Sequence, residues 1–113
     1  MDTRIRWAVI EIEKNLHAPL EVARLAAAVN LSPSRFTYLF RRDIGMSPVR
    51  FVRQRRLERA GELLDTTFLT VKEVMAQVGF NDPSHFTRDF RTSHGLGPRA
   101  WRQARRHRPA ISG

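Results

Sequence analysis

Two short stretches of the sequence bring polar and basic side chains together at helical spacing. The first holds Ser34, Arg35, Thr37 and Tyr38, and the second, fifty residues later, holds Ser84, His85, Thr87 and Arg88. These side chains donate and accept hydrogen bonds, and the guanidinium of Arg88 can bond two acceptors lying in one plane. Both stretches therefore favour recognition of a polar partner by hydrogen bonding.

Catalysis fits the same residues poorly. Asp82, Ser84 and His85 are close in sequence, but Asp82 is placed to cap a helix, and adjacent residues on a helix diverge by about 100°. The chain has no cysteine, no phosphate-cradling glycine loop, and histidines without metal-ligand spacing. We therefore predict that the chain is not an enzyme and that it needs no metal and no cofactor.

The charge of the chain points to a polyanionic partner. Its 113 residues carry a net charge of +9, and arginine supplies every basic residue except Lys14 and Lys72. The arginines are spread along the whole chain and are not confined to one amphipathic segment, which favours nucleic acid over a membrane surface.

The hydrophobic content suits a packed, intracellular domain. Hydrophobic residues make up 42% of the chain, which is enough for a core. No uncharged apolar run approaches about 20 residues, and the first residues, MDTRIRWAVIEIEKNL, do not resemble a signal peptide. We expect a cytoplasmic protein without a membrane partner.

Apolar residues recur at helical spacing almost everywhere, so we predict an all-α fold. Ser32-Pro33, Ser47-Pro48, Asp82-Pro83 and Gly97-Pro98 mark helix starts, because proline is tolerated at the first helical position. Thr70 and Glu73 form a capping box, and Asp2 or Thr3 caps the first helix. Seven helices are expected, at 3–15, 20–28, 33–43, 48–65, 70–77, 83–93 and 98–106.

The helical pattern occurs twice in the sequence. Residues 33–48 (PSRFTYLFRRDIGMSP) align with residues 83–98 (PSHFTRDFRTSHGLGP) at an offset of 50, with eight of 16 positions identical. The preceding segments, LEVARLAAAVNL and LTVKEVMAQVGF, align at an offset of 49, so the change of offset falls in a turn. We interpret this as a duplicated helix-turn-helix unit.

Each copy supplies a residue that suits the turn, Asn30 in the first and Gly79 in the second. The phenylalanines of the second helix of each copy recur at a spacing that faces a core. The opposite face carries the polar residues named above, and Arg41 and Arg91 lie a turn further on. A plain pair of packed helices is the alternative for a single copy, but two copies in one basic chain favour nucleic-acid recognition.

Further motifs give the chain a family resemblance over nearly its whole length. They are Ala76-x-Val78-Gly79-Phe80, Ser84-x-Phe86, Phe90-Arg91, Gly95-x-x-Pro98 and Trp101-Arg102, supported by Pro19-Leu20 and Arg56-Leu57 with Ala60 and Leu63-Leu64. With these motifs the chain resembles the DNA-binding region of the AraC/XylS family of bacterial transcription regulators.

The resemblance implies two subdomains joined by a long central helix, each placing one recognition helix in the major groove of double-stranded DNA. We expect a first subdomain at 1–47, a central linker helix at 48–65, a second subdomain at 66–106 and a frayed basic tail at 107–113. The central helix is about 27 Å long at ~1.5 Å per residue, whereas major-groove segments on one face of the DNA duplex recur every ~34 Å. The site implied is a promoter operator with two non-identical half-sites.

Residue roles follow from the exposed faces and from the resemblance. Contacts with bases are expected from Ser34, Arg35, Thr37, Tyr38, Ser84, His85, Thr87 and Arg88. Contacts with phosphates are expected from Arg41, Arg50, Arg53 and Arg91, although a solvated face is the alternative for Arg50 and Arg53. His85 also fits a simple surface histidine.

Other partners stay open at this point. Relatives of this kind imply a contact with RNA polymerase, and many carry an N-terminal sensing or dimerisation domain ahead of this region. Others are complete at this length, and the segment alone is expected to bind as a monomer. A helical RNA-binding or protein-interaction module is the main alternative class, but it does not account for two capped helix starts in one register.

Overall fold

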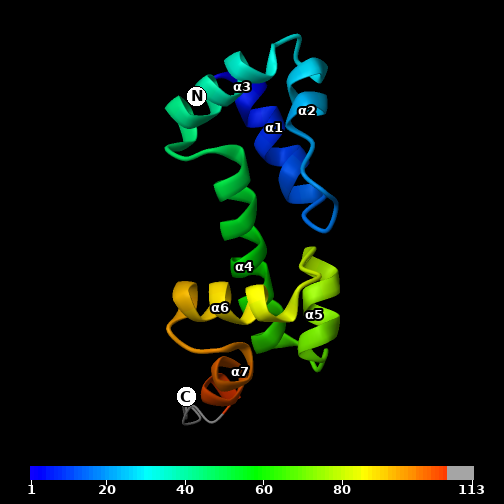
Figure 1. Cartoon of the computed structure of the whole chain (residues 1–113), viewed down its shortest axis with the longest axis vertical. Coiled ribbons are helices and arrows are strands. Elements are labelled where there is room, and N and C mark those ends of the chain that lie inside the picture. Colours follow the sequence, from blue (N-terminus) through cyan, green and yellow to red (C-terminus); the bar gives the residue numbers. More distant parts are fainter. Residues whose placement is uncertain (107–113) are drawn as a thin grey trace, which may run out of the picture. The chain divides into compact units, whose positions relative to one another are not determined.

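A computed structural model describes residues 1–106 of the chain. Within this range the chain is all-α and has seven helices, as the sequence predicts (Figure 1). They are α1 (Thr3–Lys14), α2 (Val22–Ala28), α3 (Pro33–Ile44), α4 (Pro48–Thr66), α5 (Val71–Val78), α6 (Pro83–His94) and α7 (Pro98–Arg106). The predicted basic tail, 107–113, lies outside the described residues. No helix in the described part has the length and apolarity needed to cross a membrane.

The chain divides into two compact units, and the boundary between them falls inside α4, between Arg55 and Arg56. The first core is built from α1, α2, α3 and the start of α4, where Val52 is buried. The second core is built from the rest of α4 with α5 and α6, and Trp101 of α7 packs against it. Helix α4 contributes buried residues to both cores. The expected division into two subdomains with a separate linker at 48–65 stays a prediction.

The helix starts follow the capping residues of the sequence. Asp2, Ser32 and Asp82 accept hydrogen bonds from backbone N–H groups in the first turns of α1, α3 and α6. Both halves of the capping box between Thr70 and Glu73 are present at α5. Each such cap satisfies a donor that a helix start otherwise leaves unpaired, and contributes about 0.5–2 kcal/mol. Local chemistry thus sets where most of these helices begin.

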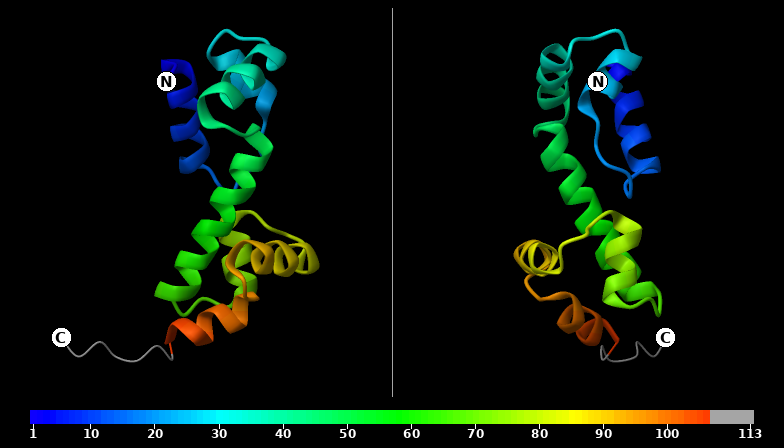
Figure 2. Two further views of the ribbon diagram at one scale, coloured as in Figure 1. Left: turned by 90° about the vertical axis from the view of Figure 1, so that its left-hand side faces the viewer. Right: turned by 45° about the vertical axis from the view of Figure 1, so that its right-hand side comes forward.

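A turn with a left-handed residue joins the two helices of each helix-turn-helix unit, α2 to α3 and α5 to α6 (Figure 2). Asn30 has φ 60° and Gly79 has φ 90°, as expected for residues chosen for a left-handed conformation. The next residue in each copy, Leu31 or Phe80, donates its backbone N–H to a carbonyl five residues earlier, at 2.9 Å in both. These two residues also pack against their cores, which completes a Schellman-type helix end in each copy.

The helix ends lie within one residue of their expected positions, except at the start of α2. Helix α2 begins at Val22 and not at residue 20, because Glu21 precedes it without a side-chain capping bond. Arg55 is half-buried, and its Nε lies 3.1 Å from the Glu13 carboxylate. Phe51 is only partly buried, although its ring packs edge-on against Phe40 at 5.6 Å between centroids.

An aromatic cluster extends the core of the second unit to the end of α6. The His94 ring stacks on Phe90 at 3.9 Å between centroids and meets Trp101 edge-on at 4.8 Å. Trp101 in turn donates its indole N–H to the Gly61 carbonyl at 3.3 Å. A side chain at position 61 would lie 2.7 Å from His94 Nε2, so this glycine is needed for α6 to approach α4. Burial lowers the pKa of His94, against opposing effects of the Phe90 carbonyl and the Glu58 carboxylate.

The turn of the second copy gives a first prediction. Gly79→Ala should lower the free energy of unfolding of the second unit by about 1–2 kcal/mol, because alanine resists a positive φ. Gly79→Asn should cost less, because Asn30 adopts a positive φ at the matching position of the first copy. Urea unfolding followed by the NMR signal of the Trp101 indole N–H measures both. Equal costs for the two variants would contradict this account of the turn.

The half-buried His94 gives a second prediction, on pH. Because the folded chain holds His94 neutral, the unfolded chain binds the proton first as the pH falls below about 6.5. Its contribution to stability is therefore present above that pH and is lost on acidification. His94→Gln should remove this loss between pH 7.5 and 5.5, as measured by urea unfolding at a series of pH values. His17→Gln, at an exposed position, should leave it intact; if both variants behave alike, His94 is not the source.

Candidate nucleic-acid interface

A shallow hollow lies on the outer face of α3, and the matching positions of α6 form a second one. The first is lined by Pro33, Ser34, Thr37, Tyr38, Arg41 and Arg42. The second is lined by Pro83, Ser84, Thr87, Arg88, Arg91 and Thr92. All six positions correspond at the offset of 50, so the duplicated sequence builds the same surface twice. Each surface lies within its own unit, and we call the two of them the α3 face and the α6 face.

The buried side of each helix explains which residues reach these faces. Phe36 and Phe40 in α3, and Phe86 and Phe90 in α6, are fully buried, as expected from their spacing. Their burial fixes the rotation of each helix about its own axis and turns the intervening polar residues outward. Of the eight residues predicted to contact bases, only Thr37 is half-buried, and the other seven are exposed.

Arg35 and His85, at corresponding positions, lie beside these faces and do not line them. The Arg35 guanidinium stacks over the Tyr38 ring, 5.3 Å from its centroid. His85 Nδ1 lies 3.7 Å from a carboxylate oxygen of Asp82, the residue that caps α6. The hydrogen bond from the His85 backbone N–H lowers the pKa of Asp82, which keeps this carboxylate charged at the helix start. Both side chains are thus engaged with neighbours in their own helix start.

Tyr38 and Arg88 occupy the centres of their faces and differ most in chemistry. Tyr38 is 58% exposed and offers a phenol and an aromatic edge. The Arg88 side chain is 67% exposed, with its Nε 3.5 Å from a carboxylate oxygen of Asp89. An exposed pair of this kind is weak and readily exchanged for a stronger acceptor. Arg88 is therefore free to form a bidentate contact with a planar pair of acceptors.

The arginines predicted to contact phosphates fall into two groups. Arg41 and Arg91 line the α3 and α6 faces at positions further along each helix. Arg50 and Arg53 lie on α4, and both are exposed. Arg50 stands in the first turn of α4, where its backbone N–H bonds the Ser47 hydroxyl at 3.2 Å. All four can reach an anion in solvent without breaking a buried contact.

Sequence reasoning missed some residues of these faces. Arg42 and Thr92 line them as well, and the signal was available, because each lies four residues after Tyr38 or Arg88. The Arg42 guanidinium already has one partner, since its Nε lies 3.0 Å from a carboxylate oxygen of Asp43.

A separate basic hollow lies at the start of α5, lined by Thr70, Val71, Arg99, Arg102, Gln103 and Arg106. Its arginines recur at a helical spacing in the sequence, which could have indicated it. Arg102 and Arg106 donate hydrogen bonds to backbone carbonyls at the end of α4, including that of Thr67. These two arginines therefore cap the C-terminal end of α4. Among residues 1–106, no group of three acidic, histidine or cysteine side chains could hold a metal ion.

Comparison with known proteins places this arrangement in a family. The family described as a helix-turn-helix domain matches residues 25–104. The arabinose operon regulatory protein of Salmonella typhimurium is 36% identical over 103 residues, which cover 90% of this chain and 37% of that protein. The chain thus spans little more than a third of the length of such curated relatives.

Solved structures agree over the whole domain. The DNA-binding domain of AdpA, a global transcriptional factor crystallised with a target DNA, is 30% identical with a TM-score of 0.86, covering 96% of this chain and 99% of that one. A probable AraC family transcriptional regulator from Rhodopseudomonas palustris is also 30% identical, with a TM-score of 0.81 and coverage of 92% and 98%. The expected family is therefore confirmed, and the chain belongs to the helix-turn-helix family of AraC-type DNA-binding domains.

Proposed function

We propose that this chain binds specific sequences in double-stranded DNA and thereby regulates transcription. The observation that carries the proposal is the pair of matching exposed faces on α3 and α6, which differ in their central residues, Tyr38 and Arg88. The family membership supports it, and the relatives include an operon regulatory protein and a global transcriptional factor.

In this proposal α3 and α6 each enter a segment of the major groove, where side chains reach base edges. Two non-identical readers imply an asymmetric operator with two half-sites. Contacts with bases are assigned to Ser34, Thr37, Tyr38, Ser84, Thr87 and Arg88, which line the faces, with Arg35 and His85 at their edges. Arg41, Arg50, Arg53 and Arg91 are assigned to phosphates, where they add affinity without sequence information.

Two further partners belong to the same proposal. Contact with RNA polymerase would couple DNA binding to transcription, and dimerisation would need a domain outside this chain. The relatives include operon regulatory proteins roughly three times as long as the matched region, which supports both partners. Neither is needed for the chain itself to bind DNA as a monomer.

Selection from random duplex DNA, read by sequencing, tests the proposal and returns the half-sites. We expect an asymmetric motif, and we expect the selected duplex to bind more tightly than a duplex RNA of equal length. The deep, narrow major groove of RNA does not admit a recognition helix. Equal or tighter binding to RNA, or the absence of any enriched motif, would contradict the proposal.

Arg88 should supply the strongest discrimination in one half-site. Arg88→Ala should cost about 1–3 kcal/mol on the selected site and relax the preference at one position, because a bidentate contact with guanine O6 and N7 is lost. Repeating the selection with the variant measures the change. Arg53→Ala is the matched control, since losing a phosphate contact should weaken all sequences alike and leave the motif intact. An unchanged motif with Arg88→Ala would remove α6 from the proposal as a base reader.

A further inference from the structure

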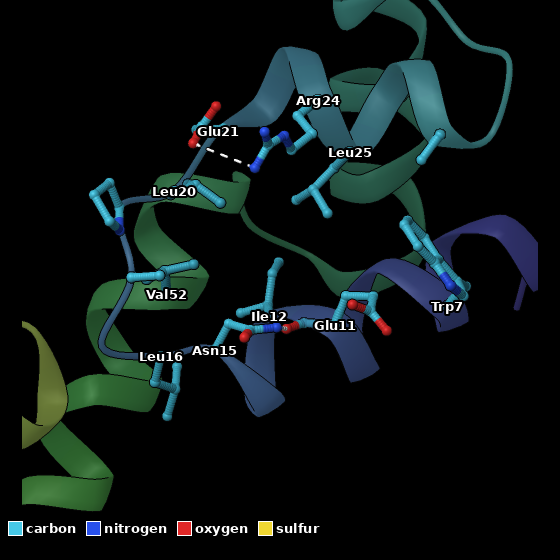
Figure 3. Close-up of a pocket in the computed structure, with 13 residues that line it drawn as sticks. Trp7, Glu11, Ile12, Asn15, Leu16, Leu20, Glu21, Arg24, Leu25 and Val52 are labelled. Atoms are coloured by element: carbon cyan, nitrogen blue, oxygen red, sulfur yellow. Dashed lines mark hydrogen bonds and ion pairs between the residues drawn. The ribbon is translucent and has the colours of Figure 1, made fainter.

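A hollow of about 420 Å³ lies in the first unit between α1 and α2, away from the α3 face. Figure 3 shows it bounded by α1 on one side and by α2 with the segment before it on the other. It shares no lining residue with either face proposed to contact DNA. Its volume falls in the range of about 300–1,000 Å³ that suits small-molecule sites.

The inner part of the hollow is apolar. Ile12 of α1, Leu25 of α2, Leu20 before α2 and Val52 of α4 line it, together with Leu16. Ile12 and Val52 are buried, and the other three are half-buried, so the lining belongs to the edge of the core. Such a surface accepts the apolar body of a ligand and gives it no polar partner.

The α1 side of the opening carries an aromatic ring and hydrogen-bond acceptors. Trp7, Glu11 and Asn15 follow one another at intervals of four residues and therefore share a face (Figure 3). Trp7 is 37% exposed, which leaves part of its indole ring open to a ligand. Asn15 donates a hydrogen bond from its side-chain NH₂ to the Glu11 backbone carbonyl at 2.9 Å. The side-chain oxygen of Asn15 is then the atom that can accept a hydrogen bond from a ligand. This side therefore attracts a hydrogen-bond donor or a cation.

The charges around the opening have the same preference. Arg24 is the basic residue among those that line the hollow, and its Nη1 lies 3.8 Å from a carboxylate oxygen of Glu21 on the α2 side (Figure 3). Glu11 has a contact of 3.9 Å with Lys14, which does not line the hollow and whose side chain is 67% exposed. Two carboxylates, Glu11 and Glu21, and one guanidinium, Arg24, therefore line the hollow, which gives the lining one net negative charge in a chain whose net charge is strongly positive.

We propose that this hollow binds a small amine with an apolar body. The protonated amine lies between the Trp7 ring and the Glu11 carboxylate. The apolar body extends between Ile12 and Leu25. Binding here involves none of the residues assigned to DNA, so it stands or falls independently of the proposed function.

Three probes with the same apolar body test the charge preference: phenylbutylamine, phenylbutanol and phenylbutanoate. Each is titrated into the whole chain and followed by the NMR signals of the two tryptophan indole N–H groups. We expect the Trp7 signal to shift with the amine while the Trp101 signal stays in place. The amine should bind on the order of tenfold more tightly than the alcohol, and the carboxylate should bind most weakly.

Glu11→Gln is the decisive variant, because it removes the charge while keeping the shape of this half-buried side chain. It should bring the affinity for the amine down to that for the alcohol and leave the alcohol unchanged. Glu62→Gln, which removes an exposed carboxylate of the second unit paired with Arg59, should change nothing. A Trp7 signal that does not move, equal affinities for amine and alcohol, tightest binding of the carboxylate, or an amine preference that survives Glu11→Gln would each overturn the proposal.

Discussion

The burial of two phenylalanine pairs governs the rest of this structure. Phe36 with Phe40, and Phe86 with Phe90, lie one turn apart and are fully buried. A helix whose inner face is fixed in this way cannot rotate without exposing two aromatic rings, at a cost of several kcal/mol. The outward direction of Tyr38 and Arg88 is thus decided by residues that touch no partner. Core packing and recognition are separate sides of one short helix.

The helix-turn-helix unit is duplicated, and the two copies differ mainly in the residues of their outer faces, which do not hold the core together. The caps, turns and inner faces keep their physical roles, with Asn30 standing in for Gly79 and Ser32 for Asp82. The outer faces change in charge and size, and their immediate neighbours change with them. Tyr38 is covered on one side by Arg35, whereas Arg88 is next to Asp89. The two faces therefore offer different chemistry on one scaffold.

Most of the fold could be predicted because its signals are local. A capping residue before proline sets the start of α3, α4 and α6 within a few bonds, and the sequence contains all of that information. The start of α2 has no such cap, and the prediction was two residues early there. The ion pair between Arg55 and Glu13 depends on two helices meeting, so helical spacing alone could not reveal it. The half-burial of Thr37, unlike the exposed Thr87, is likewise a matter of tertiary packing.

The α1–α2 hollow raises the question of how an occupant could influence the α3 face, which is proposed to contact DNA. Helix α2 belongs to both, since it lines the hollow and begins the first helix-turn-helix unit. A ligand shifts a binding equilibrium only by as much as its own affinity differs between the two states of the protein. The turn after α2 is held by the Leu31 backbone hydrogen bond and by Asn30 in its left-handed conformation, which resists a change of angle between α2 and α3. Coupling would therefore require α2 and α3 to move together relative to α1, because the turn joins them.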